Sequence, residues 1–351
     1  MKALITGGAG FIGQWTARCM ADTWTLTALD VLSGQVHQDP DASAAAFPGE
    51  VVRGDITDLD AWRTLSRPDV VIHLAAETGT AQSMYEAERY RRINVEGTRL
   101  AARMAAEWGT PLIAMSSRAV YGEGRYRHAD GTISFGSATQ PGAIPEASRE
   151  SDDHRPVSVY GETKSEGEAL LAEYAHRIPV TVVRPQNVVG PGQSLHNPYT
   201  GVLAAFLARM REGKPILVYG DGEQTRDFVA VQDVAVLLQW LAEHPAETGE
   251  VRTLNVGTGL RSTMNQIAGF ALDGAPDGGH QVAHVQVHRA GDIAHACSDQ
   301  GHSVAVGAPQ PVVSTAEAVS AFIRWAWDKP KASSQVWDDA LDELANRGLS
   351  S

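Results

Sequence analysis

The sequence predicts a doubly wound α/β fold, in which a parallel sheet carries helices on both faces, together with a smaller interleaved C-terminal lobe. Two observations predict this class. Short apolar runs alternate with helical stretches along the first half of the 351 residues, and a glycine-rich turn joins the first run to the first helix. A composition of 43% hydrophobic and 20% charged residues is typical of a globular protein.

The expected strands are nearly continuous apolar runs, as parallel strands buried on both faces require. The helical stretches between them show apolar residues at helical spacing. The expected strands cover 2–6, 24–29, 51–54, 69–75, 111–116 and 179–184, and the expected helices cover 11–21, 58–66, 84–107 and 158–176.

Two regions depart from the alternation. Residues 123–155 are rich in Gly, Pro, Ser and charge, which predicts a long loop or excursion. Residues 330–351 carry apolar side chains at helical spacing, which predicts a short amphipathic tail helix; these are Val336, Trp337, Leu341 and Leu344.

The expected domain organisation has three parts. A first domain covers 1–185 and includes the insert, and a second lobe covers mainly 186–330. The chain is expected to cross back to the first domain near 225–260, and the tail helix occupies 331–351.

Charge and cysteine content exclude several classes of function. The formal net charge is −13 and no dense Lys/Arg run occurs, which disfavours binding to nucleic acid or to an anionic membrane. No apolar run reaches the ~18 residues of a membrane span, and no cleavable leader precedes the glycine motif. Cys19 and Cys297 stand far apart without CxxC spacing, so we expect no disulfide and a cytoplasmic location.

No metal site is expected. His280, His284 and His288 recur every fourth residue, but the surrounding apolar residues alternate as in a strand. No supporting carboxylate is evident in the sequence around them, so exposed strand histidines are the better interpretation.

The glycine-rich turn predicts a dinucleotide site. Gly7, Gly10 and Gly13 follow a strand and open a helix at the spacing that allows a tight turn, close approach of a pyrophosphate and close helix packing. Phe11 and Ile12 begin that helix, whose free N–H groups favour phosphate oxygens.

Asp30 ends the second strand, where a carboxylate accepts hydrogen bonds from an adenosine ribose diol. A 2′-phosphate there would meet a like charge, so NAD is favoured over NADP. Asp55 and Ile56 follow the third strand and are placed to touch the adenine edge, although Asp55 is equally explained as a helix-start residue.

A candidate catalytic group follows later in the chain. Tyr160 and Lys164 lie four residues apart at the start of a helix, and a nearby cation favours the phenolate form of a tyrosine. Ser116 and Ser117 lie just past the fifth strand, at the sheet edge where ligands bind in this class of fold. A serine there can contact the substrate oxygen that Tyr160 protonates.

The chain resembles the extended short-chain dehydrogenases/reductases of the NAD-dependent nucleotide-sugar epimerase/dehydratase family, from Thr6 to about Trp327. This resemblance implies a Rossmann-type fold, an NAD cofactor and a nucleotide-sugar substrate. The matching segments are TGGAGFIG (6–13), HLAA (73–76), NVEGT (94–98), SSRAVYG (116–122), YGETK (160–164), RPQNVVGPGQ (184–193), TRDFV (225–229) and NVGTG (255–259).

The resemblance also implies residue roles. Ser117 and Tyr160 match the catalytic pair, and Lys164 matches the residue that binds the nicotinamide ribose and tunes the tyrosine. Further cofactor contacts are implied at Leu74, Ala75, Ala76, Asn94 and Ser116. Substrate contacts are implied at Thr80, Gln82, Ser83 and Arg118 for the sugar, and at Asn187, Arg226 and Arg289 for the diphosphate or base. His196, Asn197 and Tyr199 lie on the loop expected to cover the nucleotide.

The residues after the catalytic serine narrow the reaction. Dehydrating relatives carry Asp-Glu there and decarboxylating relatives a Glu, whereas this chain has Arg118 and Ala119. The segment around them is similar to the dTDP-L-rhamnose 4-epimerase-like branch. The insert 123–155 lacks the cysteines common in that branch, so the sequence does not identify the sugar of the substrate.

Three functions remain at this point. The first is 4-epimerisation of a dTDP- or UDP-activated hexose or 6-deoxyhexose, and the second is reduction of a dTDP-4-keto-6-deoxyhexose. The third is a non-catalytic NAD-sensing or scaffold protein. The resemblance further implies a homodimer paired through the helices 84–107 and 158–176, with Ala101, Ala102, Ala105, Leu170 and Leu171 at the contact.

Overall fold

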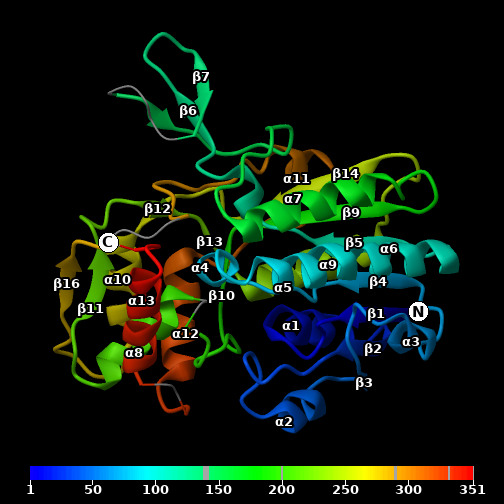
Figure 1. The fold of residues 1–351 in the computed structure, drawn as a ribbon, viewed down its shortest axis with the longest axis horizontal. Coiled ribbons are helices and arrows are strands. Elements are labelled where there is room, and N and C mark those ends of the chain that lie inside the picture. Colours follow the sequence, from blue (N-terminus) through cyan, green and yellow to red (C-terminus); the bar gives the residue numbers. More distant parts are fainter. Residues whose placement is uncertain (137–141, 199–200, 288–290, 331–332, 351) are drawn as a thin grey trace.

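The computed structural model of the chain describes residues 1–136, 142–198, 201–287, 291–330 and 333–350. It contains a seven-stranded parallel sheet with the strand order β14-β9-β5-β4-β1-β2-β3, which confirms the predicted fold class (Figure 1). The strands are β1 (Lys2–Thr6), β2 (Thr25–Asp30), β3 (Glu50–Arg53), β4 (Val70–His73), β5 (Leu112–Met115), β9 (Val180–Pro185) and β14 (Val251–Val256).

Two apolar cores cover the sheet, one on each face, because successive strand residues point to opposite sides. In β1, Ile5 belongs to the core that holds α1 and α9, whereas Leu4 belongs to the core that holds α6 and α7. The four helices are α1 (Phe11–Met20), α6 (Gly97–Trp108), α7 (Val159–Ala172) and α9 (Val231–Glu243).

The side chains expected at the dimer contact are not available for it. All five small or apolar residues proposed for it are buried in the core of the same chain, where they pack α6 and α7 onto the sheet; they are Ala101, Ala102, Ala105, Leu170 and Leu171. Apolar spacing on a helix marks a buried face, and the tertiary structure decides what covers that face.

The expected helix over 84–107 is interrupted. A π-helical turn lies between α5 and α6 and contains Asn94, whose amide bonds the backbone of Glu77 and the hydroxyl of Thr163. Such π turns reorient one side chain at the cost of regular hydrogen bonding. The short elements of this domain are α2 (Pro40–Ala45), α3 (Leu59–Arg63), α4 (Thr80–Ser83), α5 (Ala87–Arg91), η1 (Arg92–Glu96) and the 3₁₀ turn η2 (Arg118–Tyr121).

The insert 123–155, predicted to be a long loop or excursion, is an excursion that contains short strands. It forms a small antiparallel sheet of β6 (Arg125–Arg127), β7 (Ile133–Phe135) and β8 (Ile144–Pro145), and β6 and β7 project from the body of the molecule (Figure 1). These strands are too short to produce a recognisable alternation of apolar residues.

The second lobe surrounds a separate core that contains Phe206 and Phe322, and Trp337 of the tail helix packs against it. Between these segments the chain returns to the large sheet as β14. The proposed domain boundaries themselves stay a prediction. The elements of this lobe are β10 (Asn187–Val189), α8 (Val202–Arg211), β11 (Ile216–Tyr219), β12 (Thr225–Arg226), β13 (Phe228–Ala230), β15 (Ser262–Thr263), α10 (Met264–Gly274), β16 (Val282–Val285), α12 (Thr315–Ala326) and α13 (Gln335–Asn346). The short helix α11 (Gly301–Ala305) packs instead against β14 of the large sheet.

Two of the three spaced histidines can be placed. His284 lies on β16 and bonds Asn265, and His280 pairs with Asp277 at 3.0 Å, while His288 lies outside the described residues. Within the described ranges, no three metal-ligating side chains gather at one point. No helix in those ranges has the length and apolarity to cross a bilayer.

His73, at the end of β4, gives the fold an expected pH dependence. Its imidazole is fully buried between the hydroxyls of Thr6 and Thr98, and burial, with a smaller effect of the Lys164 charge, lowers its pKa to about 3. The unfolded chain therefore binds one more proton than the native chain between about pH 3 and pH 6.5. We expect the free energy of unfolding to fall as the pH drops through this window, by up to ~1.4 kcal/mol per unit from this group.

Urea unfolding at pH 7 and pH 5 measures this effect. His73→Gln keeps a donor and an acceptor but does not titrate, so its unfolding free energy should depend less steeply on pH than that of the wild type. Equal slopes for both proteins would contradict the assignment.

Candidate functional site

The glycine turn between β1 and α1 can accept only glycine at two of its positions. Gly7 has φ +67°, and a Cβ placed on it would lie 2.8 Å from the backbone nitrogen of Ala75. A Cβ on Gly13 would lie 2.5 Å from the Gly7 carbonyl oxygen. Gly10 precedes α1 and contributes no side-chain cap, so the helix N-terminus at Phe11 is bare backbone, as a phosphate-binding turn requires.

Asp30 lies beside this turn. Its carboxylate accepts hydrogen bonds from the backbone N–H groups of Ala9 (3.1 Å) and Leu32 (2.9 Å), and His37 lies 3.8 Å away. The side chain is buried at the carboxyl end of β2, which brings the predicted ribose ligand and the predicted phosphate turn together.

The remaining predicted cofactor residues line the same sheet edge to different degrees. Leu74 and Ala75 continue β4 next to Thr6, whose carbonyl and hydroxyl accept their backbone N–H groups, and Ala76 follows them. Asp55 accepts two hydrogen bonds from Thr57 and pairs with Arg92 at 3.2 Å, so its carboxylate also organises the start of α3.

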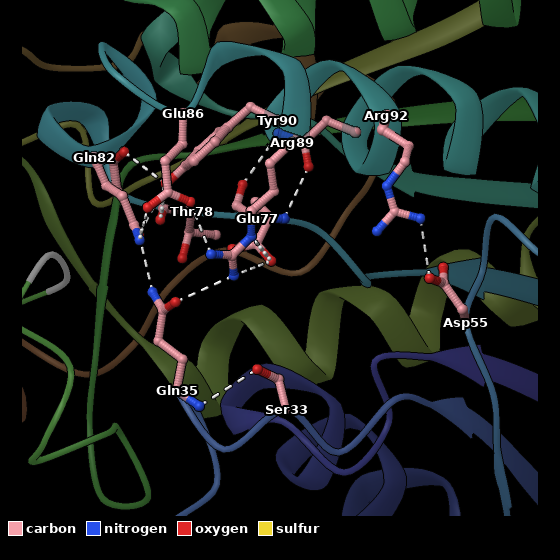
Figure 2. Close-up of polar contacts among 12 residues, drawn as sticks. Ser33, Gln35, Asp55, Glu77, Thr78, Gln82, Glu86, Arg89, Tyr90 and Arg92 are labelled. Carbon is pink, nitrogen blue, oxygen red and sulfur yellow. Dashed lines mark hydrogen bonds and ion pairs between the residues drawn. The ribbon is translucent and has the colours of Figure 1, made fainter.

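A polar cluster connects the loop after β2 to the segment that carries α4 and α5 (Figure 2). Gln35 donates to Gln82 at 2.9 Å and accepts from Arg89 at 3.1 Å. Arg89 also pairs with Glu77 at 2.7 Å, and the Tyr90 hydroxyl donates to the carbonyls of the loop before α4. Gln82 was predicted to contact the sugar. In the structure its side chain instead hydrogen-bonds Gln35 and Glu86, and these bonds hold the loop before α4 in place.

The predicted catalytic pair meets at the carboxyl end of β5. Ser117 starts the η2 turn and hydrogen-bonds the side chain of Tyr160, while the backbone N–H of Tyr160 donates to the Ser83 hydroxyl at 3.0 Å. Burial raises the pKa of Tyr160, and the hydrogen bond from Ser117 and the charge of Arg118 act in the opposite direction. Ser83 thus positions the tyrosine, and Arg118 is the cation whose field reaches it in this structure.

Lys164 lies one helical turn further along α7. Its ammonium donates to the Met115 carbonyl at 2.9 Å, and burial lowers the pKa of Lys164 to about 8, although the Glu168 carboxylate opposes this shift. The amine sits next to the end of β5 and at the same sheet edge as Ser117.

A buried ion pair behind the catalytic residues was not predicted from the sequence. Glu168 pairs with Arg184 of β9 at 2.6 Å and accepts a hydrogen bond from the Ser116 hydroxyl. Arg184 donates to the Tyr121 hydroxyl (2.7 Å) and contacts His154 (2.7 Å). The spacing Tyr160, Lys164, Glu168 on one helix face was an available signal, because four-residue steps align side chains.

The predicted substrate residues of the second lobe are only partly brought together. Arg226 donates to the carbonyls of Thr225, Ile293 and Ala294, which fixes its guanidinium beside the 291–297 segment. Asn187 begins β10, and its buried side-chain oxygen has no hydrogen-bond partner in the described part of the chain. Arg289 lies outside the described residues, and so does Tyr199; His196 and Asn197 precede it, with Asn197 buried.

Asp227, next to Arg226, is a second residue that sequence reasoning missed. Its fully buried carboxylate accepts hydrogen bonds from Thr258 and Gly259 after β14 and from Ser298. It therefore ties the returning strand to the 291–298 segment. The burial raises the pKa of Cys297 to about 12, with the Asp227 charge as the next cause, so this thiol is not a nucleophile at neutral pH.

A small cleft lies between the catalytic turn and the second lobe. Its lining includes Arg118, Glu123, Gln186, His295 and Cys297. One wall is therefore the turn that follows Ser117, and the other is the 295–297 segment.

The site defines the class of protein. A parallel sheet with a GxxGxxG turn, an acidic residue ending β2 and a Ser-Tyr-Lys group at the end of β5 defines an extended short-chain dehydrogenase/reductase. The model of the NAD-dependent epimerase/dehydratase family matches residues 3–257, and the chain belongs to that family.

Known proteins extend this result. The chain is 39% identical over 329 residues to a dTDP-L-rhamnose 4-epimerase of Burkholderia thailandensis, covering 87% of this chain and 89% of the relative. It is 30% identical to a UDP-glucose 4-epimerase of Mycolicibacterium smegmatis, covering 94% and 99%. The crystal structure of the Thermotoga maritima UDP-glucose 4-epimerase with UDP-glucose aligns with a TM-score of 0.76 at 27% identity, covering 93% and 98%.

NAD is the cofactor of the family, and this chain fits it. A solved relative, MoeE5 in complex with UDP-glucuronic acid and NAD, aligns with a TM-score of 0.74 at 26% identity and covers 93% of this chain and 99% of its own. In this chain the Gly7 position leaves no room for a Cβ, the α1 N-terminus carries no side-chain cap, and Asp30 stands next to both. These features suit a pyrophosphate and an unphosphorylated ribose.

Proposed function

We propose that this protein is an NAD-dependent 4-epimerase of a nucleotide-activated hexose or 6-deoxyhexose, with dTDP or UDP as the nucleotide. The observation that carries the proposal is the placement of Ser117, Tyr160 and Lys164 together at the carboxyl end of β5. The similarity to dTDP-L-rhamnose and UDP-glucose 4-epimerases supports the substrate class.

In the proposed mechanism Tyr160 moves the proton. Its side chain takes the proton of the sugar C4 hydroxyl, while Ser117 donates a hydrogen bond to the same oxygen. The glycine turn and Asp30 would hold NAD, which would supply a reversible acceptor for the C4 hydride on either face of the sugar. After the C4 hydride leaves, the substrate is a 4-keto sugar, and this sugar rotates within the site. The hydride then returns to the opposite face of C4, and Tyr160 gives the proton back. Atoms and electrons therefore balance without any further reactant.

The catalytic turn favours epimerisation over the other reactions of the family. Dehydration and decarboxylation need an additional acid or base beside the catalytic serine, and here Arg118 and Ala119 follow Ser117. Arg118 is a cation whose charge lies close enough to act on Tyr160. A cation there stabilises negative charge on the tyrosine oxygen and cannot abstract a proton.

A 4-ketoreductase is the second candidate, because the same three residues suit it. It differs in cofactor use, since a reductase must exchange its cofactor in every turnover. Asp30 disfavours the 2′-phosphate of NADP, and no arginine occurs at positions 31–36 to receive one. A tightly held NAD is what an epimerase needs.

The experiment that tests the function follows the cofactor. We expect purified protein to carry NAD and to interconvert the C4 epimers of a dTDP- or UDP-hexose without added cofactor, as proton NMR of the sugar detects. Stoichiometric oxidation of NADPH with a dTDP-4-keto-6-deoxyhexose, without epimerisation, would assign the reductase instead. If the protein were non-catalytic, the third candidate, neither assay would detect any conversion of the sugar nucleotide.

We further propose a cytoplasmic homodimer paired through α6 and α7, a proposal supported by the family resemblance and, for the compartment, by the two separated cysteines. Exposed residues of these helices are charged: Arg103 bonds Glu107 within α6 at 2.8 Å, and Glu162 of α7 bonds Arg91 of the neighbouring α5 at 3.1 Å. We expect sedimentation at micromolar concentration to show twice the chain mass of 37.5 kDa. A single species at the chain mass would refute the dimer.

A further inference from the structure

Arg261 lies in the turn between β14 and β15 and is a partly buried cation that the mechanism above does not use. Both terminal nitrogens of its guanidinium are buried, and neither has a hydrogen-bond partner among the residues that the structure describes. Among the described ion pairs none involves Arg261, although burial of an unpaired charge carries a large free-energy cost. An anionic ligand would supply the partner that the described residues do not.

The position of Arg261 places it next to the predicted diphosphate residue. In the β12–β15 ladder Arg226 pairs with Ser262, the residue that follows Arg261. Both guanidinium charges act on His295, whose pKa is lowered first by burial and then by Arg261 and, more weakly, Arg226. Both also act on the hydroxyl of Tyr126. Two like charges therefore converge on one region, which an anion between them would stabilise.

This region opens toward the catalytic turn. The charge of Arg261 acts to lower the pKa of both His295 and Cys297. These two residues line the small cleft whose other wall contains Arg118. The side-chain oxygen of Gln186 in the same cleft is buried without a partner and can accept a ligand hydroxyl. Glu123 is the carboxylate of this region, and its oxygens accept the backbone N–H of Ala294 and the hydroxyl of Tyr126; within the described ranges it forms no ion pair with Arg261.

We propose that Arg261 is a further binding residue for the diphosphate of the sugar nucleotide, acting beside Arg226. This inference rests on the proposed substrate class. A guanidinium fork pairs with two phosphate oxygens at once, and the buried setting strengthens each charged hydrogen bond. The ligand class is a nucleoside diphosphate, which offers the anionic oxygens for Arg261 and hydroxyl donors for Gln186.

The test measures binding and stability on the NAD-containing protein. Arg261→Met removes the charge at similar length, Arg261→Lys keeps it, and Arg324→Met on the exposed side of α12 is the matched control. Calorimetry gives Kd for dTDP, UDP, inorganic pyrophosphate and thymidine. For Arg261→Met we expect at least about 10-fold weaker binding of dTDP, UDP and pyrophosphate, with thymidine binding unchanged. Arg261→Lys should recover part of the loss.

Stability separates a binding role from a structural one. Because the buried charge is unpaired without ligand, Arg261→Met should leave the melting temperature of the nucleotide-free protein unchanged or raised. A lowered melting temperature with equal losses for pyrophosphate and thymidine would assign Arg261 to the fold and overturn the inference, as would unchanged Kd values. Arg261-dependent dTDP binding without epimerisation would refute the proposed function alone, whereas epimerisation with unchanged Kd values would refute the role of Arg261 alone.

Discussion

Tyr160→Phe is expected to lower kcat for 4-epimerisation by about 10²–10⁴-fold, the usual loss when a positioned general acid/base is removed. The side chain is half-buried, and Ser117 and the charge of Arg118 both act on its hydroxyl. The ring also packs edge-on against Tyr90 with centroids 6.5 Å apart, and phenylalanine keeps that packing. Binding of dTDP should therefore change by no more than about threefold.

A steady-state assay with NMR detection of the epimer measures this loss, and calorimetry measures the retained binding. Tyr174→Phe, near the end of α7, is the matched control, because Tyr174 packs against the core and lies away from the sheet edge. Near wild-type turnover of Tyr160→Phe would remove this residue from the mechanism.

Glu168→Ala is expected to cost about 3–5 kcal/mol of unfolding free energy, because it leaves the buried charge of Arg184 without its carboxylate. The two side chains are 9% and 6% exposed, so water compensates little. Arg184 also holds Tyr121 of the catalytic turn, and Ser116 donates to Glu168. We therefore expect kcat to fall together with stability, since the Ser117 turn loses its support.

Glu166→Gln is the matched control for this substitution. Glu166 lies two residues away on the same helix, is 46% exposed and is 3.8 Å from Arg91, so its loss should change the unfolding free energy by less than about 1 kcal/mol. Urea unfolding of both variants measures the contrast. Equal small effects would show that the Glu168–Arg184 pair contributes little.

The charge of Glu168 has a second expected consequence. Its carboxylate raises the pKa of Lys164, which burial has already lowered to about 8. Two other titratable or charged groups lie near this amine. The imidazole of His73 is neutral around pH 8, and Arg184 is paired with Glu168 itself. In Glu168→Gln the Lys164 ammonium should lose its proton at lower pH, so the alkaline decline of activity should begin at lower pH than in the wild type.

The sequence by itself determined the class of fold and predicted the cofactor half of the site. The strand-turn-helix at Gly7 to Gly13 can be recognised because its constraints are local: a positive φ and a helix packed against its own turn admit only glycine. Continuous apolar strands likewise predict a parallel sheet without knowledge of their order. Asp30 and Ser117 then follow from one rule, that ligands bind at the carboxyl ends of such strands.

Only the tertiary structure decided which polar groups from distant segments pair with each other. Glu168 and Arg184 come from a helix and a strand, and nothing local in either segment states that they form an ion pair behind Ser116. Arg261 was indistinguishable from a surface arginine until the folded chain showed its guanidinium buried and without a partner. In the same way Ala101 and Leu170 mark buried faces in sequence, and the fold assigned those faces to the sheet of the same chain. Periodicity reports that a face is buried, whereas contacts between distant segments depend on how all the elements pack together.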